Sequence, residues 1–211
     1  MLYWFGKIFI GPFVWLIYRP KVLHWKRLRS KGGVMYLCNH FSLADAVAIT
    51  AVNPRTVHFM GKESLFSTPI GNLFFRSLLM IPAGEEGSHL GPVKRAIAML
   101  QKGMAFGIFP EGHRSVDYTD QDTPEKGAAF IAVRTNAPII PIYVDPLCWK
   151  RMRIRMSIGE WIYPDQVAKN CPGQRPVDAV LDAIEDALMT LRQEVEDTVP
   201  PRLKKKVGSG S

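Results

Sequence analysis

The stretch Cys38-Asn39-His40-Phe41-Ser42-Leu43-Ala44-Asp45 decides the fold, because it joins an apolar run to a helical one. Before it, residues 34–38 are apolar and follow two glycines, which predicts a buried strand. After it, residues 46–52 are apolar and rich in alanine, which predicts a helix. His40 therefore stands where a strand gives way to a helix. In open α/β sheets, ligands bind at such carboxyl ends of strands.

Asp45 follows His40 by five residues and falls in the first turn of the predicted helix. From there its carboxylate can hold one imidazole nitrogen while the other nitrogen faces a substrate, which is the arrangement of a general base. A second interpretation stays open. Ser42-x-x-Asp45 is also a capping box, and a histidine beside such a box can be a packed side chain without chemistry.

A second polar stretch, Phe109-Pro110-Glu111-Gly112-His113-Arg114-Ser115, follows the predicted strand 105–109. Asn-His-x4-Asp followed by Phe-Pro-Glu-Gly-x-Arg-Ser resembles the glycerolipid acyltransferases of the 1-acylglycerol-3-phosphate acyltransferase (lysophosphatidate acyltransferase) family. Gly71-Asn72-Leu73-Phe74-Phe75-Arg76 and Ala137-Pro138-Ile139-Ile140-Pro141-Ile142 fit the same family. The blocks match in order over about residues 34–144.

The resemblance implies transfer of a fatty acyl chain from acyl-CoA or acyl carrier protein to the sn-2 hydroxyl of 1-acyl-sn-glycerol 3-phosphate, giving phosphatidic acid. It implies neither a metal nor a bound cofactor. A hydroxyl needs a base, whereas a thiol of pKa roughly 8.5 leaves a thioester readily. We therefore expect His40 to be the base and Asp45 to set its tautomer. Open alternatives are acylation of another lysophospholipid or of glycerol 3-phosphate, and a non-catalytic membrane-surface lipid-binding protein of the same fold.

The acceptor's phosphate calls for guanidinium groups, which clamp phosphate through two parallel hydrogen bonds. The resemblance places Arg76 and Arg114 at this phosphate. Gly112 lets the backbone approach a ligand. Glu111 is expected to orient Arg114 or to accept a hydrogen bond from the glycerol hydroxyl. Ser115 completes the substrate-binding set that the resemblance implies.

Lys62 resembles the family's lysine after the second strand and is the third expected catalytic residue, because it can stabilise the tetrahedral oxyanion. Structural alternatives stay open: Lys62 as a solvated lysine, Arg76 as a helix-end cation, and Glu111 as part of a structural ion pair. His113 departs from the threonine or serine that the family usually carries, which puts the fine substrate preference in doubt.

Cys38 offers a different mechanism, because residues two apart on a strand point to the same side and Cys38 would then face His40's side. An acyl-cysteine intermediate is the hypothesis, and an inert buried thiol is the alternative. The three cysteines follow no metal-binding spacing. We expect free thiols in a reducing compartment.

The net charge of +8 is concentrated at the two ends of the chain. Residues 1–31 hold seven basic residues and no acidic one, and residues 202–206 hold four more basic residues. This distribution argues against a nucleic-acid groove and for contact with an anionic membrane surface. Walker, Gly-x-Gly-x-x-Gly and Gly-x-Ser-x-Gly motifs are absent from the sequence, so those nucleotide-binding and hydrolase classes are not indicated.

Residues 2–18 are nearly all apolar or aromatic, interrupted by Lys7 and Pro12, and are shorter than the about 20 residues of a spanning helix. They predict a monotopic anchor on the cytosolic face of a membrane, continuing to Lys31 as a second amphipathic helix. A single span, or a segment packed only on the protein's own core, stays open. We therefore divide the chain into an anchoring segment (1–31), an acyltransferase domain (32–201) and a basic tail (202–211) that ends in an added Gly-Ser linker.

From residue 34 onward, strand and helix patterns alternate, which predicts an α/β class with a mixed, mainly parallel sheet flanked by helices. The resemblance implies that this sheet has the glycerolipid acyltransferase fold. Strands are expected at 34–38, 56–61, 77–82, 105–109, 138–144 and 153–158. Helices are expected at 43–52, 64–76 (interrupted at Pro69), 91–102, 124–135 and 177–197. Arginines 151, 153 and 155 alternate with apolar residues, which predicts either a cationic face for phosphates or a solvated strand face.

Overall fold

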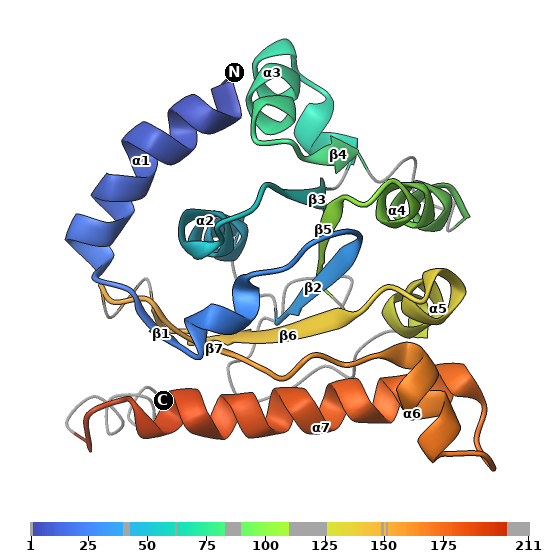
Figure 1. The fold of residues 1–211 in the computed structure, drawn as a ribbon. Coiled ribbons are helices and arrows are strands. Elements are labelled where there is room, and N and C mark those ends of the chain that lie inside the picture. Colours follow the sequence, from blue (N-terminus) through green and yellow to red (C-terminus); the bar gives the residue numbers. More distant parts are fainter. Residues whose placement is uncertain are drawn as a thin grey trace, which may run out of the picture.

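The computed structural model describes residues 2–39, 43–61, 63–82, 90–109, 126–148, 150 and 152–201. In this part of the chain a seven-stranded sheet forms the centre, with strand order β1-β7-β6-β2-β5-β3-β4 (Figure 1). All neighbouring strands are parallel except β6 and β7, which are antiparallel. The expected mixed, mainly parallel sheet is thus confirmed. The strands are β1 (Lys21–Leu23), β2 (Val34–Cys38), β3 (Val57–Gly61), β4 (Ile81–Pro82), β5 (Ala105–Ile108), β6 (Ile139–Val144) and β7 (Arg155–Ile158).

Helices cover both faces of the sheet (Figure 1). Helices α1 and α2 pack on one face, and α4, α5 and α7 pack on the other. The helices are α1 (Leu2–Tyr18), α2 (Leu43–Val52), α3 (Pro69–Ser77), α4 (Leu90–Gln101), α5 (Lys126–Thr135), α6 (Pro164–Asn170) and α7 (Pro176–Asp197), with short 3₁₀ turns at Trp25–Leu28 and Glu63–Phe66. Among the described residues, no helix is both long and apolar enough to cross a membrane.

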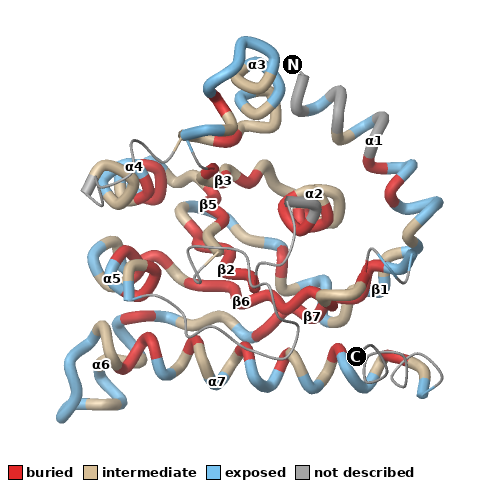
Figure 2. Tube along the Cα trace, turned by 180° about the vertical axis from the view of Figure 1, so that it is seen from behind, coloured by how far each residue is buried: buried red, intermediate tan, exposed pale blue. Residues whose placement is uncertain are grey.

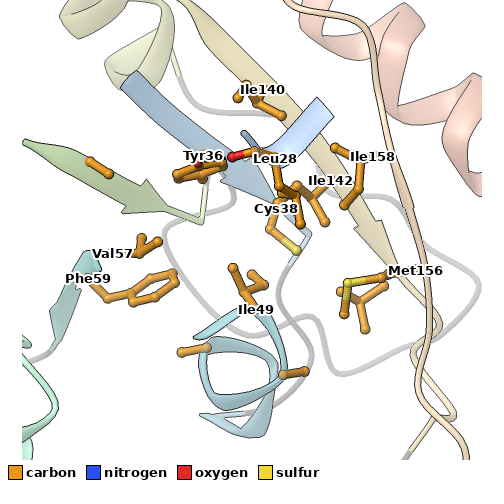
Figure 3. Packing of buried hydrophobic residues seen from close by; sticks show 14 of the residues in the cluster. Leu28, Tyr36, Cys38, Ile49, Val57, Phe59, Ile140, Ile142, Met156 and Ile158 are labelled. Atoms are coloured by element: carbon orange, nitrogen blue, oxygen red, sulfur yellow. Dashed lines mark hydrogen bonds between the residues drawn. The ribbon is translucent and has the colours of Figure 1, made fainter. Parts of the chain in front are cut away.

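Strand β2 reads as a continuous apolar run because both of its sides are buried, as is usual for a central parallel strand. Tyr36 and Cys38 belong to the core on the α2 side, and Met35 and Leu37 belong to the core on the α4–α5–α7 side. Figure 3 shows Cys38 pointing from β2 towards the side where Ile49 of α2 lies. The two cores lie on opposite faces of the sheet, between it and the helical layers.

Two of the expected elements are not found: a second N-terminal helix and a strand at 77–82. Residues 19–31 form no second amphipathic helix: β1 pairs in parallel with β7, with Lys21 opposite Arg155, and a 3₁₀ turn follows. The pairing provides hydrogen-bond partners for the backbone N–H and C=O groups of β1. The segment is too short for sequence periodicity to indicate whether it is a helix or a strand. Residues 77–82 form no full strand, because α3 continues to Ser77 and only Ile81–Pro82 pairs with β3. Leu79 adopts a φ of 58°, which turns the chain between them.

The remaining element boundaries agree with the sequence to within a few residues. The expected helix 64–76 is a 3₁₀ turn followed by α3, whose first residue is Pro69, because proline suits the first helical position. Helix α6 was not predicted. The expected helix 177–197 is confirmed as α7, and its buried side comprises Ala179, Val180, Leu181, Ile184, Leu188, Leu191 and Val195.

Arg55 forms hydrogen bonds with the loops that precede the two central strands β2 and β5. Its guanidinium donates to the Ser30 hydroxyl at 3.1 Å, the Gly32 carbonyl at 2.8 Å and the Gly103 carbonyl at 3.1 Å. Arg55→Met removes these charge-assisted bonds and should cost about 2–3 kcal/mol of unfolding free energy. The thermal midpoint should fall by roughly 4–10 °C in a calorimetric scan. Arg134→Met, on the exposed last turn of α5, is the control and should leave the midpoint unchanged. Equal midpoints for the two variants would contradict the role of Arg55.

Candidate active site

The topology brings the starts of the two motif-bearing stretches to one edge of the sheet. Strand β2 lies between β5 and β6 and runs parallel to both, with Leu37 opposite Ile108 and Cys38 opposite Ile142. The chain therefore leaves β2 and β5 at neighbouring points of the same carboxyl edge, where ligands of open α/β sheets bind. Asp45 and Arg76 lie within the described residues. The other expected site residues lie outside them: His40, Lys62, Glu111, Gly112, Arg114 and Ser115.

Asn39, the residue directly before His40, is anchored to the end of β6. It is almost fully buried, its amide nitrogen donates to the Val144 carbonyl at 2.9 Å, and the Val144 N–H donates to its amide oxygen at 2.8 Å. The side chain thus continues the β2–β6 pairing by one step and fixes the chain where the motif begins. Sequence reasoning gave Asn39 no role of its own. The available signal was a polar residue at the end of a fully apolar strand.

Asp45 lies in the first turn of α2, as expected, and is only 3% exposed. The positive end of the helix dipole favours a carboxylate in this turn. Burial of a carboxylate is costly unless its charge is compensated, so Asp45 is placed for a specific interaction at this edge of the sheet. The contact between Asp45 and His40 stays a prediction, since His40 lies outside the described residues.

Cys38 is fully buried in the core on the α2 side, where its thiol contacts the Asn39 amide oxygen at 3.5 Å. An acyl thioester needs room for its chain, so this position favours the inert, small hydrophobic side chain over the acyl-cysteine hypothesis. The expectation of free thiols is confirmed for Cys38, Cys148 and Cys171. Within the described ranges, no three His, Cys, Asp or Glu side chains gather as metal ligands would.

Helix α3 presents Arg76 in its last turn, exposed to solvent. The Nε atom of Arg76 donates to the Asn72 amide oxygen at 2.6 Å. A guanidinium has five N–H donors, so this bond orients the group and leaves it the capacity to bind a phosphate. Both the phosphate-binding and the helix-end interpretations of Arg76 stay open.

The start of α3 is fixed by Thr68 and Gly71. The Gly71 N–H donates to the Thr68 hydroxyl at 3.0 Å, which caps the helix. A Cβ atom on Gly71 would lie 2.5 Å from the Leu65 carbonyl oxygen, so only glycine lets α3 pack this closely against the preceding turn. This close approach explains why a glycine begins the motif that ends at Arg76.

Gly71→Ala should therefore displace α3 and cost about 1–3 kcal/mol of unfolding free energy. Gly127→Ala is the matched control, because Gly127 also lies in a helix and a Cβ there meets nothing within 4 Å. Alanine has the higher helix propensity, so the control should stabilise the fold by about 0.5–1 kcal/mol. Urea denaturation measures both, and effects of the same sign would contradict the packing argument.

The expectation of an exposed arginine face is wrong at Arg155, whereas Arg153 is exposed and Arg151 lies outside the described residues. Arg155 is 4% exposed and its Nη1 lies 3.7 Å from a carboxylate oxygen of Asp145, which is equally buried. All of β7 is buried because α7 covers it and β1 pairs at its edge, so neither the phosphate-binding nor the solvated face exists at Arg155. Asp145 directly follows Val144, so this ion pair lies beside the Asn39 anchor at the carboxyl edge.

Lys7, the charge inside the apolar N-terminal stretch, points into the protein. Its Nζ donates to the Asn53 carbonyl at 2.6 Å and reaches the Arg55 carbonyl at 3.4 Å, just beyond the end of α2. Carbonyl groups at a helix C-terminus attract a cation. Partial burial lowers the pKa of the Lys7 ammonium below its ordinary value. Lys7 therefore fixes α1 to the helix whose other end carries Asp45.

The acyltransferase family model, described as Acyltransferase, matches residues 19–145. A 1-acyl-sn-glycerol-3-phosphate acyltransferase of Bacillus subtilis is 26% identical over 183 residues, which cover 83% of this chain and 89% of that protein. One from Cocos nucifera is 28% identical over 158 residues, which cover 72% of this chain but 50% of that protein. This chain thus spans most of the bacterial relative and about half of the plant one.

The crystal structure of the 1-acyl-sn-glycerophosphate (LPA) acyltransferase PlsC from Thermotoga maritima matches with a TM-score of 0.67. The match covers 93% of this chain and 78% of that chain at 22% sequence identity. The likeness shows that the two proteins share a fold, which confirms the fold expected from the sequence.

Proposed function

Because this chain belongs to the acyltransferase family and is an acyltransferase enzyme, we propose that it acylates the sn-2 hydroxyl of 1-acyl-sn-glycerol 3-phosphate and so makes phosphatidic acid. The names of the relatives from Bacillus subtilis and Cocos nucifera support this acceptor. The observation that carries the proposal is the parallel pairing of β2 with β5, because it starts both motif-bearing stretches at one edge of the sheet.

In the proposed reaction, His40 takes the proton of the acceptor hydroxyl while the hydroxyl oxygen attacks the thioester carbonyl carbon of acyl-CoA or acyl carrier protein. The tetrahedral intermediate collapses, the carbon–sulfur bond breaks, and the proton on His40 passes to the departing thiolate. Asp45 holds the imidazole in the required tautomer. Lys62 stabilises the oxyanion of the intermediate.

The phosphate of the acceptor is assigned to Arg76 and Arg114, with Glu111, Gly112 and Ser115 completing the binding site. The exposure of Arg76 and its bond to Asn72 support this assignment, because an oriented guanidinium at the surface can meet a lipid headgroup without losing a buried partner. The reaction needs no metal or bound cofactor, since the donor thioester is already activated.

We place the enzyme at the cytosolic face of a membrane with α1 as a monotopic anchor. Lys7 is turned inward, whereas several large apolar side chains of α1 are exposed: Trp4, Ile8, Phe13, Trp15, Leu16 and Ile17. Aromatic side chains near basic residues suit the boundary between headgroups and acyl chains. At this position the enzyme would take its lipid acceptor from the membrane and release its lipid product into it.

An acceptor screen tests the proposal. Purified protein is mixed with a radiolabelled acyl donor, either acyl-CoA or acyl carrier protein loaded with the acyl chain. Each reaction contains one acceptor: lysophosphatidate, another lysophospholipid or glycerol 3-phosphate. The products are separated by lipid chromatography. We expect labelled phosphatidic acid and stoichiometric thiol release with lysophosphatidate. Transfer to a different acceptor only would overturn the proposed substrate, and absence of thiol release with every acceptor would support a lipid-binding protein instead.

A further inference from the structure

Helix α3 carries an apolar face that no part of the described protein covers. Ile70, Leu73 and Phe74 are 82%, 71% and 53% exposed. Spacings of three and four residues place these side chains on one side of the helix. Figure 2 shows α3 as a largely exposed element at the periphery of the molecule. Three large apolar side chains gathered at one surface site indicate a binding surface rather than scattered exposure.

The opposite side of α3 is firmly attached, so the exposed face is a fixed feature. Phe75 packs against Phe66 with ring centroids 5.9 Å apart. Thr68 caps the helix and Gly71 seats it against the Leu65 carbonyl. Arg76 and Asn72, joined by a hydrogen bond, lie on a side of the helix away from Ile70 because each residue turns the helix by about 100°. The helix is therefore amphipathic, with a phosphate-binding candidate on its polar side.

The charge distribution identifies the occupant. The chain has a net charge of +8, and its first 31 residues hold seven basic and no acidic residues. In the view of Figure 1 the amino end of α1 points towards α3, and α1 also has exposed apolar residues. A second copy of this chain would bring the same positive charge to the contact, whereas an anionic bilayer offers both opposite charge and an apolar interior.

We propose that Ile70, Leu73 and Phe74 form a second membrane-contact surface, separate from α1, that inserts into the outer acyl region of an anionic bilayer. In this position the polar side of α3 lies at the level of the lipid phosphates, with Arg76 directed at a headgroup. The surface then docks the enzyme at the point where its lipid acceptor enters. The idea that a lipid acceptor enters at this surface rests on the proposed function, whereas the membrane contact itself does not.

Vesicle binding of the full chain tests this surface. Vesicles of phosphatidylglycerol and phosphatidylcholine are sedimented with wild-type protein and with the triple variant Ile70→Gln/Leu73→Gln/Phe74→Gln. Loss of three apolar contacts should weaken partitioning on the order of 10²-fold. The matched control is Phe130→Gln/Met189→Gln, which removes exposed apolar side chains from α5 and α7. This control should partition like wild type, and all three proteins should share one thermal midpoint.

A fluorescence measurement tests insertion at a single position. Cys171 is changed to serine, and an environment-sensitive dye is attached to Leu73→Cys or, as the control, to Met189→Cys; Cys38 and Cys148 are buried. We expect a blue shift and quenching by brominated lipids for the dye at position 73 only. Equal spectra at both positions, or a triple variant that partitions like wild type, would overturn the proposal.

Two further readouts separate the alternatives. Light scattering of wild type and triple variant in solution detects self-association, and a dimer lost only in the variant with unchanged vesicle binding would assign the surface to a second copy. Transfer to a short-chain, monomeric lysophosphatidate should be equal in both proteins. If neither protein acylates this acceptor while vesicle binding still differs, the proposed function fails and the membrane surface stands.

Discussion

His40→Ala is expected to lower acyl transfer by on the order of 10²–10⁴-fold, which is the contribution of a positioned general base. The acceptor hydroxyl is a weak nucleophile at neutral pH, and the variant would have to attack the thioester without removal of its proton. The measurement is kcat/KM for thiol release from acyl-CoA with lysophosphatidate as acceptor. The loss should fall on kcat, because the imidazole is needed in the transition state and contributes little to binding of the ground state.

His24→Ala is the matched control for this experiment. His24 is exposed and follows β1, which runs opposite to β2, so it lies at the other edge of the sheet. Its loss should leave kcat unchanged. Asp45→Asn should lower kcat without a change in thermal midpoint, because the amide keeps the shape of the side chain but not the charge that holds the imidazole. Near-normal transfer by His40→Ala would show that a different group acts as the base.

Arg155→Met is expected to lower the unfolding free energy by about 3–5 kcal/mol, the largest stability effect that the structure indicates. The substitution removes the guanidinium from beside the buried Asp145 carboxylate, which also accepts a hydrogen bond from the Leu147 N–H at 2.9 Å, and loss of an opposite charge next to a buried carboxylate is costly. Urea denaturation at constant pH measures the change. A loss below about 1 kcal/mol, typical of surface ion pairs, would contradict it.

The double variant Asp145→Leu/Arg155→Met distinguishes loss of the pair from loss of one partner. Removing both charges removes the cost of burying either one, so the double variant should be more stable than Arg155→Met alone. The exposed pair Arg192–Glu196, with nitrogen and oxygen 2.8 Å apart on α7, is the control. Arg192→Met should cost less than about 1 kcal/mol.

The local sequence pattern correctly predicted the elements that have one apolar and one polar side, and those whose ends carry glycine, proline or polar residues. The strand 34–38 and the helix 43–52 agree with β2 and α2 in their bounds, because a glycine pair precedes the strand and the apolar run of the sequence is interrupted between the two elements. The expected helix 177–197 agrees with α7 to within one residue at its start, since its apolar residues recur at helical spacing. The position of Asp45 in the first turn of α2 followed from the same reasoning.

Other features depend on partners far away in the chain. β1 has three residues and is stabilised by pairing with β7, which lies more than a hundred residues later. The buried state of Arg155 depends on Asp145, β1 and α7 together, whereas strand alternation alone predicted an exposed face. The role of Asn39 depends on where β6 ends. None of these partners can be identified from periodicity within one segment.

The sequence by itself determined the class of fold, the order of the central strands and helices along the chain, and the motifs on which the acyl-transfer chemistry is proposed. It could do so because burial and turn preferences act within a few residues. Only the tertiary structure decided which strand ends share an edge, where the buried ion pair and Lys7 lie, and that the apolar side of α3 faces outward. These properties arise from contacts between distant segments, and their free energy exists only once the chain has folded.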